Sequence, residues 1–249
     1  MRITGERIVT PEGGFNASWQ RHAACYSLTE SFLGEGPVLD LGCGSGHARV
    51  HLAPRRSVGV DLDHDSLACQ DRETLVADIR RIPLADASFD SVLCVHAIEH
   101  VPDPEQVLQE SVRVLRQGGT AIFVTPNRLT FGRPDEIIDP YHYIEYDAAQ
   151  LAELCGRFFA EVTPYGVFGS KRYMDFHHAE RRQLDALLRL DPLGLRRLIP
   201  RKPRQFLYDW ALTRARQNKG GPAVQFELDD FHLGADDLEN SLDVLVVCR

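Results

Sequence analysis

The sequence predicts an α/β fold in which a mostly parallel sheet carries helices on both faces. Three observations predict this class: short, nearly continuous apolar runs recur along residues 37–125, helical patterns separate them, and the first run ends in a glycine-rich loop. Such apolar runs suit strands that are covered on both faces, and helices between them imply right-handed crossovers. A chain of 249 residues is long enough for one such domain with an elaboration.

Apolar and β-branched runs predict seven strands along the chain. Their expected ranges are 37–41, 57–61, 74–78, 89–95, 120–124, 160–168 and 242–248. A short helix is expected over 63–70, directly after the second strand. The last two strands are separated by a long insertion that has helical patterns interrupted by prolines.

Capping residues mark two further helices. The first is expected to begin at Asp103, a good N-cap, with Pro104 at the first helical position and Gln106 at the spacing of a capping box. Gly118-Gly119 is expected to end it, because glycine readily adopts the left-handed conformation that stops a helix. The second helix is expected to start at Asp147.

We expect a single domain with four parts. Residues 1–36 form an N-terminal helical cap, 37–170 the core, 171–235 a basic helical insertion or lid, and 236–249 the last strand, which returns to the core sheet. Residues 171–219 carry 13 Lys+Arg and 5 Asp+Glu, although the whole chain has a net charge of −8. The insertion is either a solvated helical face, a lid that admits an anionic acceptor, or, least expected, a patch that touches a membrane surface.

Composition excludes several classes of protein. The net negative charge argues against a general nucleic-acid binder, because neutralising phosphates requires a basic face. No run of 18 apolar residues predicts a membrane span, and the first residues lack the apolar core of a signal peptide. The six cysteines include no Cys-x-x-Cys pair, which argues against a zinc site or a disulfide framework and fits a cytoplasmic protein.

The most specific motif is the glycine-rich loop after the first strand, Asp40-Leu41-Gly42-Cys43-Gly44-Ser45-Gly46. It is either a tight strand-to-helix turn, a dinucleotide-binding loop, or the binding loop of a nucleoside ligand without a pyrophosphate. The spacing Gly-x-Gly-x-Gly differs from the dinucleotide pattern Gly-x-Gly-x-x-Gly and favours the last of these.

Three carboxylates strengthen this interpretation. Asp40, Asp61 and Asp78 each close one of the first three strands, so they are expected along the edge of the sheet where open α/β folds bind ligands. Asp61 is placed to accept hydrogen bonds from both hydroxyls of a ribose, and Asp78 to accept one from an adenine amino group. Asp40 is expected near the ammonium group of a ligand.

With these motifs the sequence resembles the class I S-adenosylmethionine-dependent methyltransferases, specifically the branch often called type 11. The resemblance covers about residues 36–127 and includes Leu84-Ala85-Asp86-Ala87-Ser88-Phe89-Asp90 and Glu99-His100-Val101-Pro102-Asp103-Pro104. It implies a Rossmann-like, seven-stranded, mostly parallel sheet whose last strand is antiparallel. Insertions before that strand commonly cover the acceptor in this superfamily, which favours the lid.

The resemblance also implies which residues bind S-adenosyl-L-methionine. The glycine loop (Gly42, Cys43, Gly44 and Gly46) would hold the methionine part, Asp61 with Leu62 the ribose, and Asp78 with Ile79 the adenine. Asp40 and Val95 complete the expected contacts. Arg21, Trp19 and Tyr26 are the candidates for a cap from the N-terminal helix.

Three histidines are candidate bases: His96, His100 and His142. A base is needed if the acceptor is a hydroxyl group that must lose its proton. Glu99-His100 is alternatively structural, or part of a transition-metal site. The ubiquinone O-methyltransferases resemble this stretch and are associated with a metal here, but they carry an acid where this chain has His96, and we expect no metal.

The loop after the fifth strand, which contains Phe131, Tyr141, His142 and Tyr143, is expected to lie over the acceptor or to pack on the next helix. The sequence therefore predicts methyl transfer to an oxygen or nitrogen of a small molecule, anionic or aromatic in character. Two alternatives stay open: a protein that binds the cofactor without catalysis, and a nicotinamide-dependent oxidoreductase. The sequence does not indicate an oligomeric state.

Overall fold

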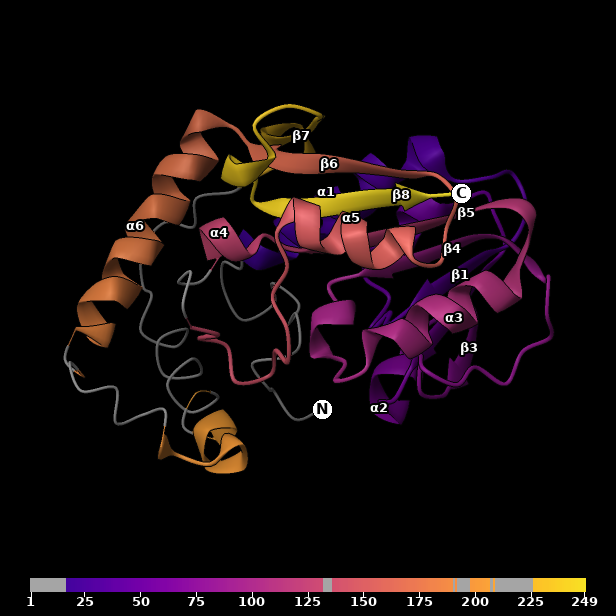
Figure 1. Ribbon diagram of the computed structural model, residues 1–249, viewed down its shortest axis with the longest axis horizontal. Helices are drawn as coiled ribbons and strands as arrows, with labels where there is room; N and C mark the ends of the chain where they lie inside the picture. Colours follow the sequence, from indigo (N-terminus) through magenta and orange to yellow (C-terminus); the bar gives the residue numbers. More distant parts are fainter. Residues whose placement is uncertain (1–16, 132–135, 190, 192–197, 207, 209–225) are drawn as a thin grey trace.

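An eight-stranded sheet forms the centre of the computed structural model, which describes residues 17–131, 136–189, 191, 198–206, 208 and 226–249 (Figure 1). The strand order is β3-β2-β1-β4-β5-β8-β6-β7. The strands are β1 (Val38–Leu41), β2 (Ser57–Asp61), β3 (Glu73–Val76), β4 (Phe89–Val95), β5 (Leu115–Pro126), β6 (Val162–Gly169), β7 (Phe231–Gly234) and β8 (Asp243–Cys248).

The first five strands run parallel to one another, and β8 runs antiparallel between β5 and β6. The chain moves outward from β1 through β2 to β3, then returns to place β4 on the other side of β1. This reversal creates a switch point, and ligands of open α/β sheets bind in the crevice that it leaves at the carboxyl ends of the strands. The mostly parallel α/β class and the reversed last strand are confirmed.

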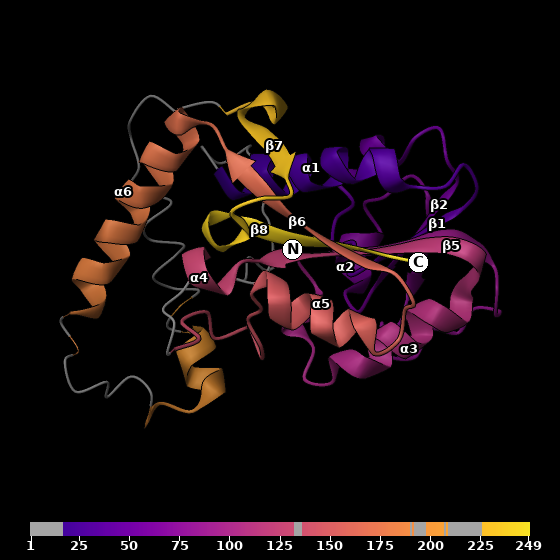
Figure 2. The same cartoon turned by 45° about the horizontal axis from the view of Figure 1, so that its top comes forward.

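Helices cover both faces of the sheet (Figure 2). One face packs against α1 (Ala17–Thr29), and the other against α3 (Pro104–Val114) and α5 (Ala148–Gly156). Each face has its own apolar core, because the central strands present fully buried side chains on both sides, as in Leu93 and Cys94 of β4. The short helices are α2 (His64–Leu67), α4 (Arg128–Phe131), η2 (Glu30–Phe32), η3 (Arg49–Leu52), η4 (Ile98–His100), η6 (Leu228–Asp230) and η7 (Leu238–Asn240).

Two sequence-based expectations are wrong. The sheet has eight strands rather than seven, because the end of the insertion, Phe231–Gly234, pairs antiparallel with β6 and covers its free edge. Gly118-Gly119 does not end a helix: α3 ends at Val114, and β5 begins at the next residue. A Cβ on Gly119 would lie 3.0 Å from the Asp90 carbonyl oxygen, so this glycine serves close packing of β5 instead.

The helix starts are predicted more accurately. Asp147 caps α5 with a complete capping box to Gln150. Asp103 precedes α3 as expected, but its carboxylate accepts a hydrogen bond from the Gln106 side chain and none from the helix backbone.

The insertion begins with α6 (Lys171–Leu188), which projects away from the sheet in both views (Figures 1 and 2). Arg196-Arg197 and residues 209–225, as well as the chain before residue 17, lie outside the described residues. Among the described helices, none is both long and apolar enough to span a membrane.

Candidate active site

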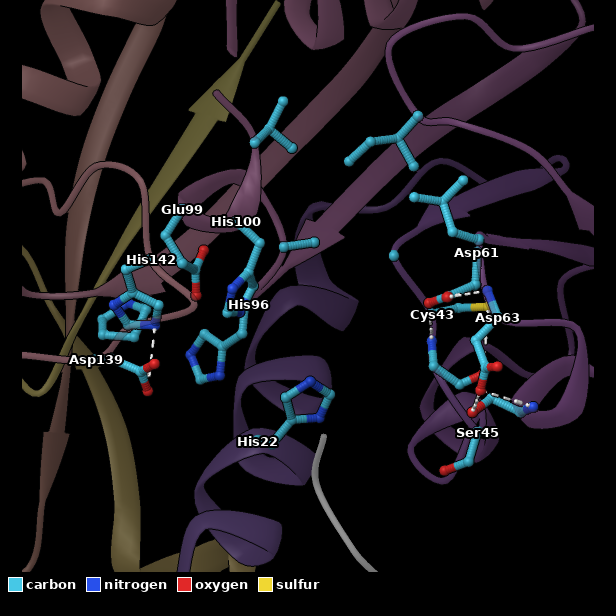
Figure 3. Close-up of a pocket in the computed structure, with 18 of the residues that line it drawn as sticks. His22, Cys43, Ser45, Asp61, Asp63, His96, Glu99, His100, Asp139 and His142 are labelled. Atoms are coloured by element: carbon cyan, nitrogen blue, oxygen red, sulfur yellow. Dashed lines mark hydrogen bonds and ion pairs between the residues drawn. The ribbon is translucent and has the colours of Figure 1, made fainter. Parts of the chain in front are cut away.

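A cavity of about 590 Å³ opens at the carboxyl ends of the parallel strands. Its walls are the segments that follow β1, β2, β3 and β4, together with part of α1 and the loop after β5. Figure 3 shows two groups of side chains in it, the first around Asp61 and Cys43 and the second around Glu99, His100 and His142. The predicted binding edge and the predicted acceptor loop therefore share one cavity.

The glycine loop has the backbone that only glycine adopts without strain. Gly42, Gly44 and Gly46 have φ angles of 68°, 52° and 66°. A Cβ on Gly42 would lie 2.3 Å from the Ala97 Cβ, whereas one on Gly44 would meet no protein atom within 4 Å. Gly44 lines the cavity, so a side chain there would occupy space that is open to a ligand.

The thiol of Cys43 lines the same end of the cavity. Burial, reinforced by the Asp40 charge, raises its pKa to about 12. The thiol is therefore neutral near pH 7 and acts as a small apolar wall rather than as a nucleophile.

Asp61 ends β2 and holds the glycine loop in place. Its Oδ2 accepts a hydrogen bond from the Gly44 amide at 2.8 Å, and its Oδ1 accepts one from the Asp63 amide at 2.9 Å. An ionised carboxylate offers about four lone-pair positions. Two acceptor positions thus remain for a ligand, which matches a pair of ribose hydroxyls.

The predicted adenine residues also line the cavity. Asp78 is bound by the Arg80 guanidinium, whose hydrogen bond lowers the pKa of the Asp78 carboxyl, and Ile79 is buried beside it. Leu62 lines the cavity with 70% of its surface exposed. An exposed leucine at a cavity rim is suited to pack on the face of a base.

Asp40 and Val95 do not line the cavity. Both are fully buried, and the Asp40 carboxylate accepts hydrogen bonds from the Tyr26 hydroxyl at 2.8 Å and from Arg72 at 2.6 Å. These bonds connect β1 to α1 and to the chain before β3, so the carboxylate performs a structural role.

The N-terminal helix contributes Arg21 and His22 to the cavity wall. The Arg21 guanidinium binds both carboxylate oxygens of the buried Asp243, the first residue of β8. Trp19 stacks on His47 instead, with ring centroids 3.9 Å apart. Of the three candidate caps, Arg21 is the one that reaches the cavity.

His96 follows β4 and has a left-handed backbone, with φ of 50°. Its Nε2 lies 2.9 Å from Asp243 Oδ1, and its ring lies 5.2 Å from that of His22. The sequence analysis missed Asp243, which lies 147 residues from His96. The signal in the sequence is that Asp243 is the one charged residue in the otherwise apolar run Asp243–Cys248.

His100 and His142 meet at the other end of the cavity, with ring centroids 4.9 Å apart. The buried Glu99 lies beside them and accepts a hydrogen bond from the Thr125 hydroxyl at 3.0 Å. His142 Nδ1 lies 3.0 Å from Glu145 Oε1. Burial opposes protonation of His142, but the bond to Glu145 and the nearby carboxylates outweigh it and raise the pKa of this imidazole.

Two groups in the described part of the chain have donor atoms close enough to hold a metal ion. In Glu99, His100 and His142 the donor atoms lie within 4.8 Å of one another, and the same holds for Cys25, His96 and Asp243. The second group is poorly suited to a cation, because Arg21 already binds both oxygens of Asp243. The first group has the imidazole and carboxylate donors that a transition metal accepts.

Part of the basic insertion lies against the acceptor loop. Arg201 donates hydrogen bonds to the carbonyl oxygens of Pro140 and Tyr141 at 2.9 and 2.7 Å, and it stacks on the Tyr143 ring at 3.4 Å. The Tyr208 hydroxyl donates to Asp139 at 3.2 Å and lines the cavity. These contacts bring residues 198–206 and 208 against the loop that follows β5.

A switch-point cavity with a glycine loop and a ribose-type carboxylate defines a protein that binds a nucleoside-containing cofactor. A family model described as a methyltransferase domain matches residues 39–123. A probable S-adenosylmethionine-dependent methyltransferase of Mycolicibacterium smegmatis is 34% identical over 242 residues, covering 92% of this chain and 91% of the relative. The chain belongs to the S-adenosylmethionine-dependent methyltransferases, and S-adenosylmethionine is its cofactor.

Two further comparisons concern parts of the chain or the fold alone. A ubiquinone biosynthesis O-methyltransferase of Nitrosomonas europaea is 33% identical over 108 residues, which are 39% of this chain and 46% of the relative. A structure from Thermotoga maritima, described as a possible histamine N-methyltransferase, matches with a TM-score of 0.58 at 19% identity, covering 92% of this chain and 89% of that one. At this identity the match shows the fold.

Proposed function

We propose that the protein transfers a methyl group from S-adenosylmethionine to an oxygen or nitrogen of a small-molecule acceptor. The observation that supports this proposal is the continuity of the cavity, which joins the glycine loop and Asp61 to the cluster of His100, His142 and Glu99. A cofactor held by the first group would present its reactive end toward the second.

The residues of the chain mainly bind and align. Asp61 offers its two remaining acceptor positions to the ribose, and the open face of Gly44 admits the methionine part of the cofactor. When bound, the cofactor supplies a methyl group that its sulfonium already makes electrophilic. Alignment of an acceptor atom with that group can account for up to about 7–11 kcal/mol of the barrier.

The lining of the acceptor end favours a molecule that donates hydrogen bonds. Glu99 and Asp139 offer carboxylate oxygens there, and Phe131 offers an aromatic wall. Among the described lining residues the guanidinium groups belong to Arg21 and Arg80, and each is paired with an aspartate. This supports a hydroxyl- or amine-bearing aromatic acceptor over an anionic one.

Two measurements test the proposal. Calorimetry with S-adenosylhomocysteine should show binding, and its absence at millimolar concentrations would contradict the assigned cavity. A radiolabelled methyl-transfer assay should then be run over matched acceptor pools of phenols, amines and carboxylic acids. Incorporation confined to the carboxylic acids would overturn the assigned acceptor class.

A cofactor-binding protein without catalysis is the second candidate. It is supported by one observation: the most specific contacts, those of Asp61 and the glycine loop, all belong to the cofactor end. Binding of S-adenosylhomocysteine without turnover across all pools would favour this candidate.

A further inference from the structure

The imidazole of His96 is fixed by a carboxylate from the far end of the sequence. His96 Nε2 and Asp243 Oδ1 are 2.9 Å apart, and the Asp243 side chain is fully buried. Burial alone would raise the pKa of the Asp243 carboxyl, but the charge of Arg21 and the hydrogen bonds from Arg21 and His96 hold it well below its usual range. Asp243 is therefore ionised and only accepts hydrogen bonds, so Nε2 must carry the proton.

Asp243 is itself held on three sides. Arg21 binds both of its oxygens and also donates to the Leu242 carbonyl oxygen at 2.7 Å. The Cys25 thiol donates to Oδ2 at 3.6 Å. Arg21 balances the charge of Asp243, and the carboxylate orients the imidazole.

The backbone of His96 is fixed as well. Its φ of 50° is unusual for a residue with a Cβ, because the Cβ then lies close to the following carbonyl oxygen. The His96 amide donates to the Val124 carbonyl oxygen at 2.8 Å, which ties this strained residue to β5. Strained residues of this kind persist where the surrounding structure determines them, often at functional sites.

The second ring nitrogen, Nδ1, is left for the cavity. The His96 side chain is 14% exposed and lines the cavity, and Nδ1 has no hydrogen-bond partner within the part of the chain that the structure describes. Figure 3 shows His96 between His22 and the cluster of Glu99 and His100. It thus lies beside the acceptor end of the cavity.

We propose that Asp243 is a positioning residue that holds His96 as the Nε2–H tautomer, so that Nδ1 accepts the proton from the acceptor hydroxyl or amine. This rests on the proposed function. In the step, a lone pair of the acceptor atom forms the bond to the methyl carbon while the carbon–sulfur pair stays on sulfur. The O–H or N–H bond breaks, its electrons remain on the acceptor atom, and the proton moves to Nδ1.

The other two histidines are less suited to this role. His142 lies beside Glu145 and Asp139, and its raised pKa favours the imidazolium, which donates protons. His100 Nδ1 lies 3.3 Å from the Tyr141 carbonyl oxygen, so its tautomer depends on a loop contact rather than on a buried carboxylate.

The charged and titratable groups around His96 come from four elements. Arg21, His22 and Cys25 face it from α1, Asp243 from β8, Glu99 from η4, and His47 from the segment between the glycine loop and η3. Burial lowers the pKa of His22 and raises that of Cys25, so both are neutral near pH 7.

Nitrogen-15 NMR of the imidazoles, in the complex with S-adenosylhomocysteine, tests the tautomer directly. The wild-type His96 signals should show a protonated Nε2 and an unprotonated Nδ1. In Asp243→Asn, and in Arg21→Met with Asp243→Leu, which removes both buried charges together, the tautomer preference should be lost. A protonated Nδ1 in the wild type, or unchanged His96 signals in the double variant, would overturn the proposal.

Asp65→Asn is the matched control, because Asp65 forms an exposed contact of 3.5 Å with His64. It should leave the His96 signals unchanged. With the acceptor found in the pool assay, His96→Asn, which tolerates the left-handed backbone, should lower kcat about 10²- to 10⁴-fold while the affinity for S-adenosylhomocysteine changes less than about threefold. A loss below tenfold would exclude His96 as the base.

If the wild-type protein does not bind S-adenosylhomocysteine, the proposed function fails. If it binds the compound and transfers methyl groups but His96 has the wrong tautomer, the His96–Asp243 assignment alone fails.

Discussion

Replacement of Asp61 by alanine is the sharpest test of the cofactor end. The carboxylate uses two acceptor positions for the amides of Gly44 and Asp63, and two remain for the ribose hydroxyls. Losing the ribose bonds should cost about 1–3 kcal/mol of binding free energy. This corresponds to a roughly 5- to 150-fold rise in the Kd of S-adenosylhomocysteine, measured by calorimetry.

The same substitution releases the glycine loop, so a stability measurement must accompany the binding assay. Chemical unfolding of Asp61→Ala should show a loss of about 1–3 kcal/mol from its two backbone hydrogen bonds. Asp65→Ala, an exposed aspartate four residues away, should change neither quantity. A folded Asp61→Ala protein with a Kd within twofold of the wild type would refute the assignment of Asp61 to the ribose.

Four further predictions concern stability and the acceptor loop. Leu151→Ala, in the fully buried face of α5, should lower the free energy of unfolding by about 2–5 kcal/mol in urea titrations. Burial lowers the pKa of His47 to about 4, so the free energy of unfolding of the wild type should fall by up to about 3 kcal/mol as the pH falls from about 6.5 to 4. In His47→Gln the free energy of unfolding should depend less on pH over this range. The pKa of His142 is raised, so protonated His142 should stabilise the fold below about pH 6.5, and this stabilisation should be lost at higher pH. Thermal unfolding of His142→Gln, measured across pH, should lack this stabilisation at low pH. Arg201→Ala removes the bonds to the acceptor loop and should speed proteolysis of that loop while the affinity for S-adenosylhomocysteine stays unchanged.

Local patterns in the sequence predict the sheet and one end of the cavity well. Asp61 ends β2 and Asp78 follows the end of β3 by two residues, and both line the cavity because parallel strands end at a common edge. Asp40 lies one residue before the end of β1, and its carboxylate is bound by Arg72, 32 residues later. A strand-end pattern does not show which carboxylates are already paired.

The residues that the sequence did not reveal depend on long-range contacts. Arg21 was identified only as a candidate cap, and its partner Asp243 lies 222 residues away. The helix end expected at Gly118-Gly119 is wrong for a related reason, because pairing of Leu115 with Phe89 starts β5 immediately after α3. In both cases tertiary contacts, rather than local propensity, decide the structure.

The ion pair between Arg21 and Asp243 has a consequence for the way the protein is made. Translation adds about 5–20 residues per second, so the guanidinium of Arg21 emerges roughly 10–40 s before its partner, which is 222 residues later. During that interval α1 carries a cation that has no carboxylate to bury against, and the slot between β5 and β6 is empty because β8 has not yet been synthesised. Nascent chains stalled before residue 243 should therefore be substrates for chaperones and proteases, and they should not bind S-adenosylmethionine.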